Sequence, residues 1–160
     1  MGVDDLDAVL AVQAACYPPS MQEAAGVVLA RLAVAPNTCL VAVDAGGICG
    51  YLFAYPSLLG VVTPLGAAFE PASQPDTLYL HDLAVAPRAH GCGLARRLVT
   101  QLLAQASRQG IAASSLVSVQ ETATFWASLG YRPADVDCPQ SRVALATYPG
   151  AARYMTRTLD

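Results

Sequence analysis

Apolar residues along this chain follow two alternating periods, one typical of helices and one typical of strands. The helical period is clearest where Leu94, Leu98, Leu102 and Ala106 share one face. In chain order, the pattern predicts helices over residues 4–16, 20–34, 94–108 and 121–129. It predicts strands over residues 38–43, 48–55, 78–85 and 111–119, another that begins at Tyr131, and a last one over 153–159.

The order of these elements predicts the fold class. The strands 38–43 and 48–55 flank a glycine-containing turn and therefore form a hairpin. Strands and helices alternate over the rest of the chain. We therefore predict an α+β fold with α/β/α layers, in which a mixed central sheet carries helices on both faces. With 160 residues and no internal repeat, we expect one domain over residues 1–160.

Local signals mark where the first helices begin and end. Pro18 and Pro19 end the first helix, because proline cannot continue a helix. Ser20 is followed three residues later by Glu23, which is the pattern of a capping box. We therefore expect the second helix to begin at Ser20.

The segment 56–76 is punctuated by proline, glycine and serine and is longer than most connections. Two interpretations remain open: the segment covers a binding site, or it is a disordered surface insertion.

Composition and charge narrow the classes of partner. The chain is 54% hydrophobic and 13% charged, with a formal net charge of −3 and no basic run. Nucleic acid and a membrane surface are therefore not expected as partners. No apolar run is long enough for a bilayer, and no signal peptide is recognised. The five cysteines occur singly, without a C-x-x-C pair, so we expect no metal, reduced thiols and a cytoplasmic location.

The window 78–99, LYLHDLAVAPRAHGCGLARRLV, carries most of the candidate chemistry. A strand leads through a glycine-containing loop into a helix, and this order directs free backbone N–H groups at one point. Both histidines of the protein, His81 and His90, lie in this window. Neither a phosphate-binding lysine motif nor G-x-G-x-x-G is present. A ligand with phosphate groups, held beside an imidazole, is the first hypothesis.

Three further patterns give the window a family resemblance. Leu83–Ala84–Val85 is followed by H-G-C-G-L-A from His90, residues 125–131 read F-W-A-S-L-G-Y, and residues 153–156 read R-Y-M-T. Together they resemble the GNAT superfamily of N-acetyltransferases over nearly the full chain, with His90 where that family usually has glutamine or arginine. A register from Arg88 also fits the glycine pattern, but it stands too close to Val85.

The resemblance implies a site for acetyl-CoA as cosubstrate. The strand end would pair its backbone with the pantetheine arm, and the loop would hold the pyrophosphate. The residues implied in binding are Leu83, Ala84, Val85, His90, Gly91, Cys92, Gly93, Leu94, Ala95, Arg96, Phe125 and Trp126.

Two features depart from the family pattern. Trp126 stands where many members have the tyrosine that protonates the leaving thiolate, and an indole N–H cannot supply that proton. Either the thiolate leaves unassisted, or another group such as Tyr79 or a water supplies the proton. The family's first strand is missing or vestigial, so a sheet edge is exposed, shared with a partner such as a second copy in a homodimer, or lost to a misplaced start.

His81 is the leading candidate for the base that accepts the amine proton, because its intrinsic pKa suits the task. Strand alternation predicts that Tyr79, His81, Leu83 and Val85 share one face while Asp82 points to the other. A structural role for His81 and a basic role for Asp82 are the alternatives. The L-H-x-L-A-V string also resembles the arylalkylamine N-acetyltransferase branch, with Tyr79 in place of a second histidine.

The function implied is acetyl-CoA-dependent N-acetylation of the primary amine of a small molecule. The amine would attack the thioester directly, through a tetrahedral intermediate whose oxyanion a backbone N–H near Leu83 stabilises. Two alternatives stay open: a non-catalytic CoA-binding regulatory module, and an acetyltransferase for protein N-termini or lysines.

Overall fold

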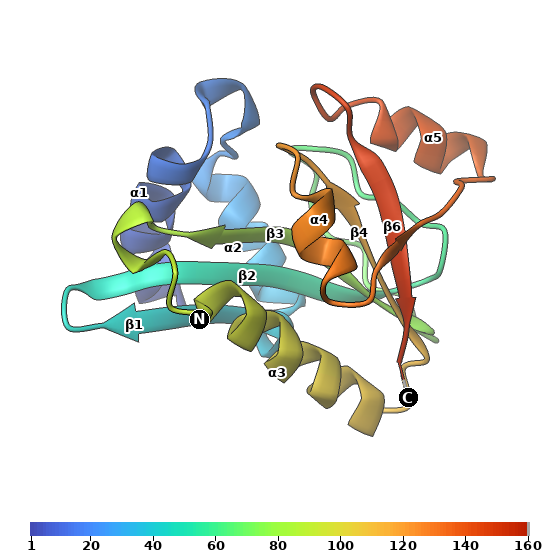
Figure 1. The fold of residues 1–160 in the computed structure, drawn as a ribbon. Helices are drawn as coiled ribbons and strands as arrows, with labels where there is room; N and C mark the ends of the chain where they lie inside the picture. The colour runs from blue at the N-terminus through green and yellow to red at the C-terminus, as the bar shows by residue number, and fades with distance from the viewer. Residues whose placement is uncertain (160) are drawn as a thin grey trace.

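A six-stranded mixed sheet forms the middle of the computed structural model, which describes residues 1–159 (Figure 1). The strands are β1 (Cys39–Asp44), β2 (Gly47–Ser57), β3 (Thr77–Val85), β4 (Ala113–Ser118), β5 (Arg132–Pro133) and β6 (Arg153–Thr158), in the order β1-β2-β3-β4-β6-β5. Only β3 and β4 are parallel neighbours; the other pairs are antiparallel. The predicted α+β class is confirmed.

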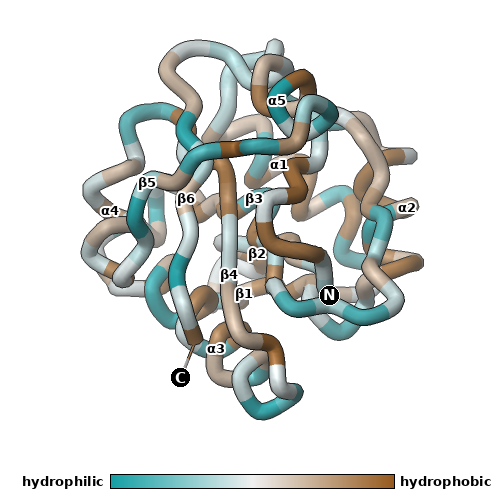
Figure 2. Tube along the Cα trace, turned by 90° about the vertical axis from the view of Figure 1, so that its right-hand side faces the viewer, coloured by the Kyte–Doolittle hydropathy of each residue, from teal (hydrophilic) through white to brown (hydrophobic). Residues whose placement is uncertain are grey.

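Helices cover both faces of this sheet. They are α1 (Leu6–Cys16), α2 (Ala25–Val34), α3 (Leu94–Arg108), α4 (Ala123–Ala127) and α5 (Pro139–Leu145). Side chains of α1, α2 and α5 share one hydrophobic core with β2 and β3, while those of α3 and α4 share a second core on the opposite face. Hydrophilic segments, drawn teal in Figure 2, gather mainly toward the outside of the trace.

The amphipathic pattern explains why α3 lies where it does. Its buried residues are Leu98, Val99, Leu102, Leu103 and Ala106. Full burial of one leucine side chain contributes about 2 kcal/mol, so this stripe anchors the helix against the sheet. None of the helices within residues 1–159 combines the length and the hydropathy that crossing a bilayer requires.

The second helix begins at Ala25, so the prediction that it begins at Ser20 is wrong. No side chain caps its amino end, and residues 19–21 form a separate turn of 3-10 helix. The carboxylate of Glu23 instead bonds Arg31 and the backbone N–H of Gly66. A buried ion pair with a distant loop therefore overrides the local capping pattern.

Two smaller differences concern the carboxyl-terminal part of the chain. The strand expected from Tyr131 is only the two-residue β5, and α5 was not predicted because it is short and begins with Pro139. Within residues 1–159 no strand precedes α1, and the amino group of Met1 donates to the Cys39 carbonyl. β1 is therefore an edge strand of the sheet.

The segment 58–76 is an ordered strap rather than a disordered insertion. Backbone N–H groups of Gly60, Val62 and Leu65 donate to side chains of the carboxyl-terminal part of the chain, namely Tyr154, Ser141 and Thr147. On the other side, the Arg31 guanidinium donates twice to the Ala67 carbonyl. Phe69 stacks on Tyr55 at a ring distance of 4.4 Å. The strap thus packs over the sheet beside His81.

Candidate active site

The parallel pair β3 and β4 opens into a cleft. The two strands are paired only from Thr77 and Ala113 to Leu80 and Leu116, although β3 continues for five residues and β4 for two beyond that point. In the unpaired part, the Leu83 carbonyl accepts a hydrogen bond from the Tyr17 hydroxyl at 3.1 Å. Because N–H and C=O of one strand residue point to the same side, the N–H of Leu83 also faces the cleft.

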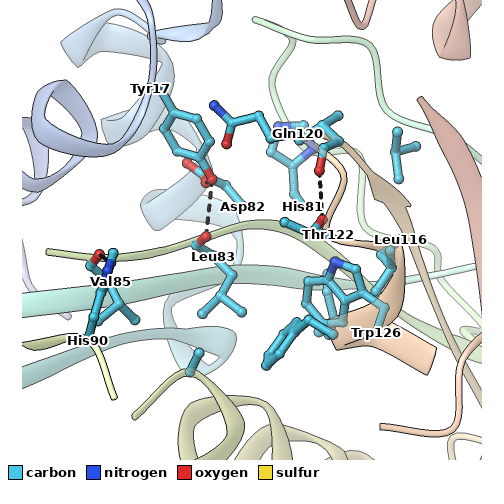
Figure 3. Close-up of a pocket in the computed structure, with 15 residues that line it drawn as sticks. Tyr17, His81, Asp82, Leu83, Val85, His90, Leu116, Gln120, Thr122 and Trp126 are labelled. Carbon is cyan, nitrogen blue, oxygen red and sulfur yellow. Dashed lines mark hydrogen bonds between the residues drawn. The ribbon is translucent and has the colours of Figure 1, made fainter. Parts of the chain in front are cut away.

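A cavity of about 240 Å³ occupies this cleft (Figure 3). Its walls come from β3, β4, the start of α3, the end of α1 and the region of α4. The lining residues are Tyr17, Leu80, His81, Asp82, Leu83, Val85, His90, Ala95, Leu116, Val117, Val119, Gln120, Thr122, Phe125 and Trp126. Of the predicted cofactor residues, the lining therefore includes Leu83, Val85, His90, Ala95, Phe125 and Trp126.

The glycine loop before α3 has the backbone that an anion site requires. Gly91 and Gly93 have φ of 80° and 70°, which side-chain-bearing residues rarely adopt, and nothing lies within 4 Å of where a Cβ would stand. Gly93 is the residue before the fifteen-residue α3, whose first N–H groups have no helical partner. The sequence prediction of a phosphate-binding helix start therefore fits the backbone found here.

Two predicted phosphate-binding side chains are directed elsewhere. Arg96 donates to the hydroxyl and carbonyl of Ser128 and so joins α3 to the end of α4. The His90 imidazole Nε2 lies 2.8 Å from the Val85 carbonyl oxygen, inside the cleft. The groups of this loop that are free to meet an anion are therefore backbone N–H groups.

A bulge in β3 changes which face His81 and Asp82 occupy. Phe53 pairs with Asp82 and Ala54 with Leu80, so His81 is an extra residue in β3. The prediction that Asp82 points away from His81 is therefore wrong, because the bulge shifts the alternation by one residue. Both side chains lie on the face that carries α1 and α2, whereas Leu83 packs toward the α3 core.

The His81 side chain is buried and bridges two polar partners. Nε2 lies 3.3 Å from Oε1 of Glu23, and Nδ1 lies 3.5 Å from the Tyr148 hydroxyl. The Tyr148 hydroxyl already donates to the Thr63 carbonyl at 2.7 Å. Burial lowers the pKa of His81, so the ring is neutral near pH 7. We assign its proton to Nε2, which faces the carboxylate, so Nδ1 keeps its lone pair.

Glu23 is a functional candidate that the sequence analysis missed. Its carboxylate accepts from Arg31, and its Oε1 accepts from both the Gly66 N–H at 2.8 Å and His81. Its main chain exchanges two hydrogen bonds with the Gln13 amide. Burial alone would raise the pKa of Glu23, but the hydrogen bonds from His81 and Arg31 hold it well below its usual range. A charged carboxylate therefore fixes the imidazole.

Asp82 is held by two tyrosines that the sequence did not single out. Tyr17 and Tyr51 place their hydroxyl oxygens 2.7 and 2.8 Å from its two carboxyl oxygens. Burial raises the pKa of Asp82. Tyr79, the predicted candidate proton donor, has a fully buried hydroxyl without a hydrogen bond and does not line this cavity.

Trp126 forms the wall of the cleft opposite β3. Its indole meets Phe125 and Tyr131 edge to face, with ring centroids 5.0 and 5.5 Å apart. The ring is thereby fixed as an apolar surface of the cavity.

A second, much smaller chamber adjoins the first cavity. Its volume is about 30 Å³, which is room for few heavy atoms. Its lining residues are Tyr17, Met21, Glu23, Leu65, His81, Asp82, Val117, Val119 and Tyr148. Tyr17, His81 and Asp82 line both spaces, so they stand at the junction. Within residues 1–159, no three histidine, cysteine or acidic side chains are grouped for a metal ion.

The model of the acetyltransferase (GNAT) family matches residues 6–131. No curated protein matches the chain. The solved structures described next share no more than 20% identity with it, so they show a common fold.

The chain is similar to GphF, a GNAT-like decarboxylase in complex with isobutyryl-CoA, with a TM-score of 0.78, 20% identity and coverage of 100% of this chain and 97% of that chain. For the loading GNATL domain of CurA from Lyngbya majuscula, the TM-score is 0.77, the identity 12% and the coverage 99% and 95%. For the ribosomal-protein-S18-alanine N-acetyltransferase from Escherichia coli, the TM-score is 0.69 and the identity is 16%. This match covers 100% of this chain and 91% of that chain.

Proposed function

Because the chain belongs to the acetyltransferase (GNAT) family, we propose that it transfers the acetyl group of acetyl-CoA to the primary amine of a small molecule. The observation that carries this proposal is the position of His81. A buried, neutral imidazole stands at the junction of the cleft of about 240 Å³ and a small chamber. A base at that junction can reach an amine in the chamber and a thioester in the cleft.

The groups around the cleft suit coenzyme A. The cleft-facing main chain of Leu83 and Val85 offers donors and acceptors for the two amides of pantetheine. The helix start after Gly93 offers unpaired N–H groups for the pyrophosphate. Trp126 supplies an apolar wall of the cleft. A polar strand edge, an apolar wall and a helix start with unpaired N–H groups together support coenzyme A as the cosubstrate.

The chamber suits an amine better than an acidic acceptor. No lysine or arginine lines it, and the guanidinium of Arg31 is already paired with Glu23. A neutral amine that attacks the acetyl carbonyl becomes cationic, and Nδ1 of His81 can take the proton. The N–H of Leu83, which faces the cleft, is placed to donate to the oxyanion.

The experiment that tests this function measures thiol release from acetyl-CoA with a panel of acceptors. The panel contains small primary amines, polyamines and peptides with free N-termini or lysines. Release with small amines, together with the acetylated product by mass spectrometry, supports the proposal. Saturable CoA binding without release for any acceptor contradicts it and favours a regulatory module. Release with peptides alone favours protein acetylation.

Decarboxylation of an acyl-CoA is a second candidate, favoured by the size of the chamber. A space of about 30 Å³ has little room for a bulky acceptor, and decarboxylation needs no second substrate. The fold similarity to a GNAT-like decarboxylase adds to this candidate. Incubation with malonyl-CoA or methylmalonyl-CoA separates the two: loss of CO₂ without thiol release indicates decarboxylation, and an unchanged substrate excludes it.

Substitution of Gly91 with alanine is expected to weaken CoA binding at least tenfold. A Cβ at φ of 80° costs about 1 to 2 kcal/mol and moves the N–H groups of the loop. Isothermal titration calorimetry with CoA gives the Kd. The matched control is Gly110→Ala, which has the same φ of 80° but lies at the far end of α3. Both variants should lose similar stability, and equal CoA affinities in the two would contradict the assignment of the loop.

A further inference from the structure

The hydroxyl of Tyr17 has one proton but two oxygen neighbours that accept hydrogen bonds. Its oxygen lies 2.7 Å from Oδ1 of Asp82 and 3.1 Å from the carbonyl oxygen of Leu83. If Asp82 is ionised, only one of these contacts contains a proton, and the other brings two lone-pair-bearing oxygens together. If Oδ1 carries a proton, Asp82 donates to Tyr17 and Tyr17 donates to Leu83. Both contacts are then hydrogen bonds.

The surroundings of Asp82 also favour a protonated carboxyl group. Its other oxygen, Oδ2, accepts from the Tyr51 hydroxyl at 2.8 Å in either state. No lysine or arginine donates to the carboxyl group, and burial raises its pKa. The titratable groups that face Asp82 from the elements packed against it are Cys16, Tyr17, Glu23, Tyr51, His81 and Tyr148. The charged Glu23 carboxylate raises the pKa of Asp82, and the five others are neutral near pH 7.

A proton donor to the departing thiolate cannot be Trp126, because an indole N–H is not acidic at neutral pH. Four titratable residues line the larger cavity: Tyr17, His81, Asp82 and His90. His81 is the proposed base, and His90 is exposed and bonded to Val85 at the loop end of the cleft. Tyr17 and Asp82 remain, and both stand at the junction where the thioester must lie.

We propose that Asp82 is a neutral carboxylic acid in the resting enzyme and that it passes its proton through the Tyr17 hydroxyl to the departing thiolate of CoA. This inference rests on the proposed acetyl transfer. When a pantetheine amide N–H donates to the Leu83 carbonyl, it displaces the Tyr17 hydroxyl from that oxygen. The Tyr17 O–H can then point into the cleft.

The proton balance of this step closes within the site. The amine nitrogen forms a bond to the acetyl carbon and loses a proton to Nδ1 of His81. The C–S bond breaks with its electron pair on sulfur, which takes the Tyr17 proton, and Tyr17 takes the Asp82 proton. The Asp82 carboxylate and the His81 imidazolium that remain are neighbours, and a proton returns from one to the other. Tyr17 is the catalytic residue in this scheme and Asp82 acts through it.

The first test removes the Tyr17 hydroxyl and varies the leaving group. Tyr17→Phe should lower kcat with acetyl-CoA about 100-fold. With the acetyl selenoester of CoA, whose selenolate leaves without a proton, the same variant should stay within a few-fold of wild type. The matched control is Tyr154→Phe, another buried tyrosine whose hydroxyl bonds the Gly60 N–H away from both cavities. Its selenoester-to-thioester rate ratio should equal that of wild type.

The second test needs no turnover. Infrared spectra of wild type minus Asp82→Asn at pH 7 should show the C=O stretch of a protonated carboxyl group. A carboxylate band in its place would overturn the inference. So would an equal loss of rate with both esters in Tyr17→Phe, because this pattern indicates a structural role. If wild type transfers no acetyl group to any amine, the proposed function and the proton transfer to sulfur both fail, and the infrared band alone decides the resting state of Asp82.

Discussion

Replacement of His81 with alanine is expected to lower kcat/KM for amine acetylation by about 100-fold or more, because a positioned base contributes at least that factor. The wild-type rate should fall toward acid as His81 takes up a proton and loses its lone pair. Since burial lowers the pKa of His81, this acidic limb should have its midpoint below the ordinary histidine value of about 6.5. The variant should lose the limb. The pH dependence of kcat/KM measures both effects.

Two comparisons make this result specific. The Kd for CoA should be unchanged in His81→Ala, because the glycine loop before α3 and the main chain of Leu83 are intact in this variant. His90→Ala, in contrast, should retain the acidic limb, because its imidazole is bonded to the Val85 carbonyl and not to Glu23. A His81→Ala variant with the wild-type pH profile would assign the base to another group.

Replacement of Arg31 with methionine is expected to reduce the free energy of unfolding by about 3 to 5 kcal/mol, since it leaves a buried carboxylate without its cation. Arg31 is only 1% exposed. It pairs with Glu23, donates to the Ala67 carbonyl and lies 4.9 Å from the ring centroid of Phe69. Urea unfolding monitored by tryptophan fluorescence measures the change. The exposed Arg108→Met serves as control and should stay within about 0.5 kcal/mol of wild type.

A double variant tests whether the loss comes from the unpaired charge. Glu23→Gln in the Arg31→Met background removes the carboxylate that the first change isolates. We expect it to recover part of the lost stability while leaving activity low, because His81 then has no anionic partner. Additive losses in the double variant would show that packing of the guanidinium, and not its charge, dominates.

The parts of the fold and site that the sequence predicted depend on local patterns. The apolar stripe of α3, the run of strand-forming residues in β3 and the glycines at 91 and 93 each constrain the backbone within a few residues. These signals place the cleft and the helix start that point to coenzyme A. They also place His81 on the strand that borders the cleft.

The parts that the sequence could not predict depend on distant pairing. The bulge at His81 exists only in the register between β2 and β3, so no pattern within β3 reveals that Asp82 shares its face. Glu23 and His81 are 58 residues apart, and Tyr17 and Asp82 are 65 apart. The local pattern at Ser20 even favoured a competing role for Glu23. The sequence alone does not distinguish a glutamate that caps a helix from one that forms a buried ion pair.

Oε1 of Glu23 couples the width of the acceptor chamber to the pKa of His81. Oε1 accepts from the Gly66 N–H of the strap and also faces His81. If substitutions lift the strap to admit a wider amine, Glu23 loses the Gly66 donor and attracts the imidazole proton more strongly. The acidic limb would then move to higher pH. A change during evolution that widens the range of amines accepted by this protein should therefore also shift the pH at which it is active.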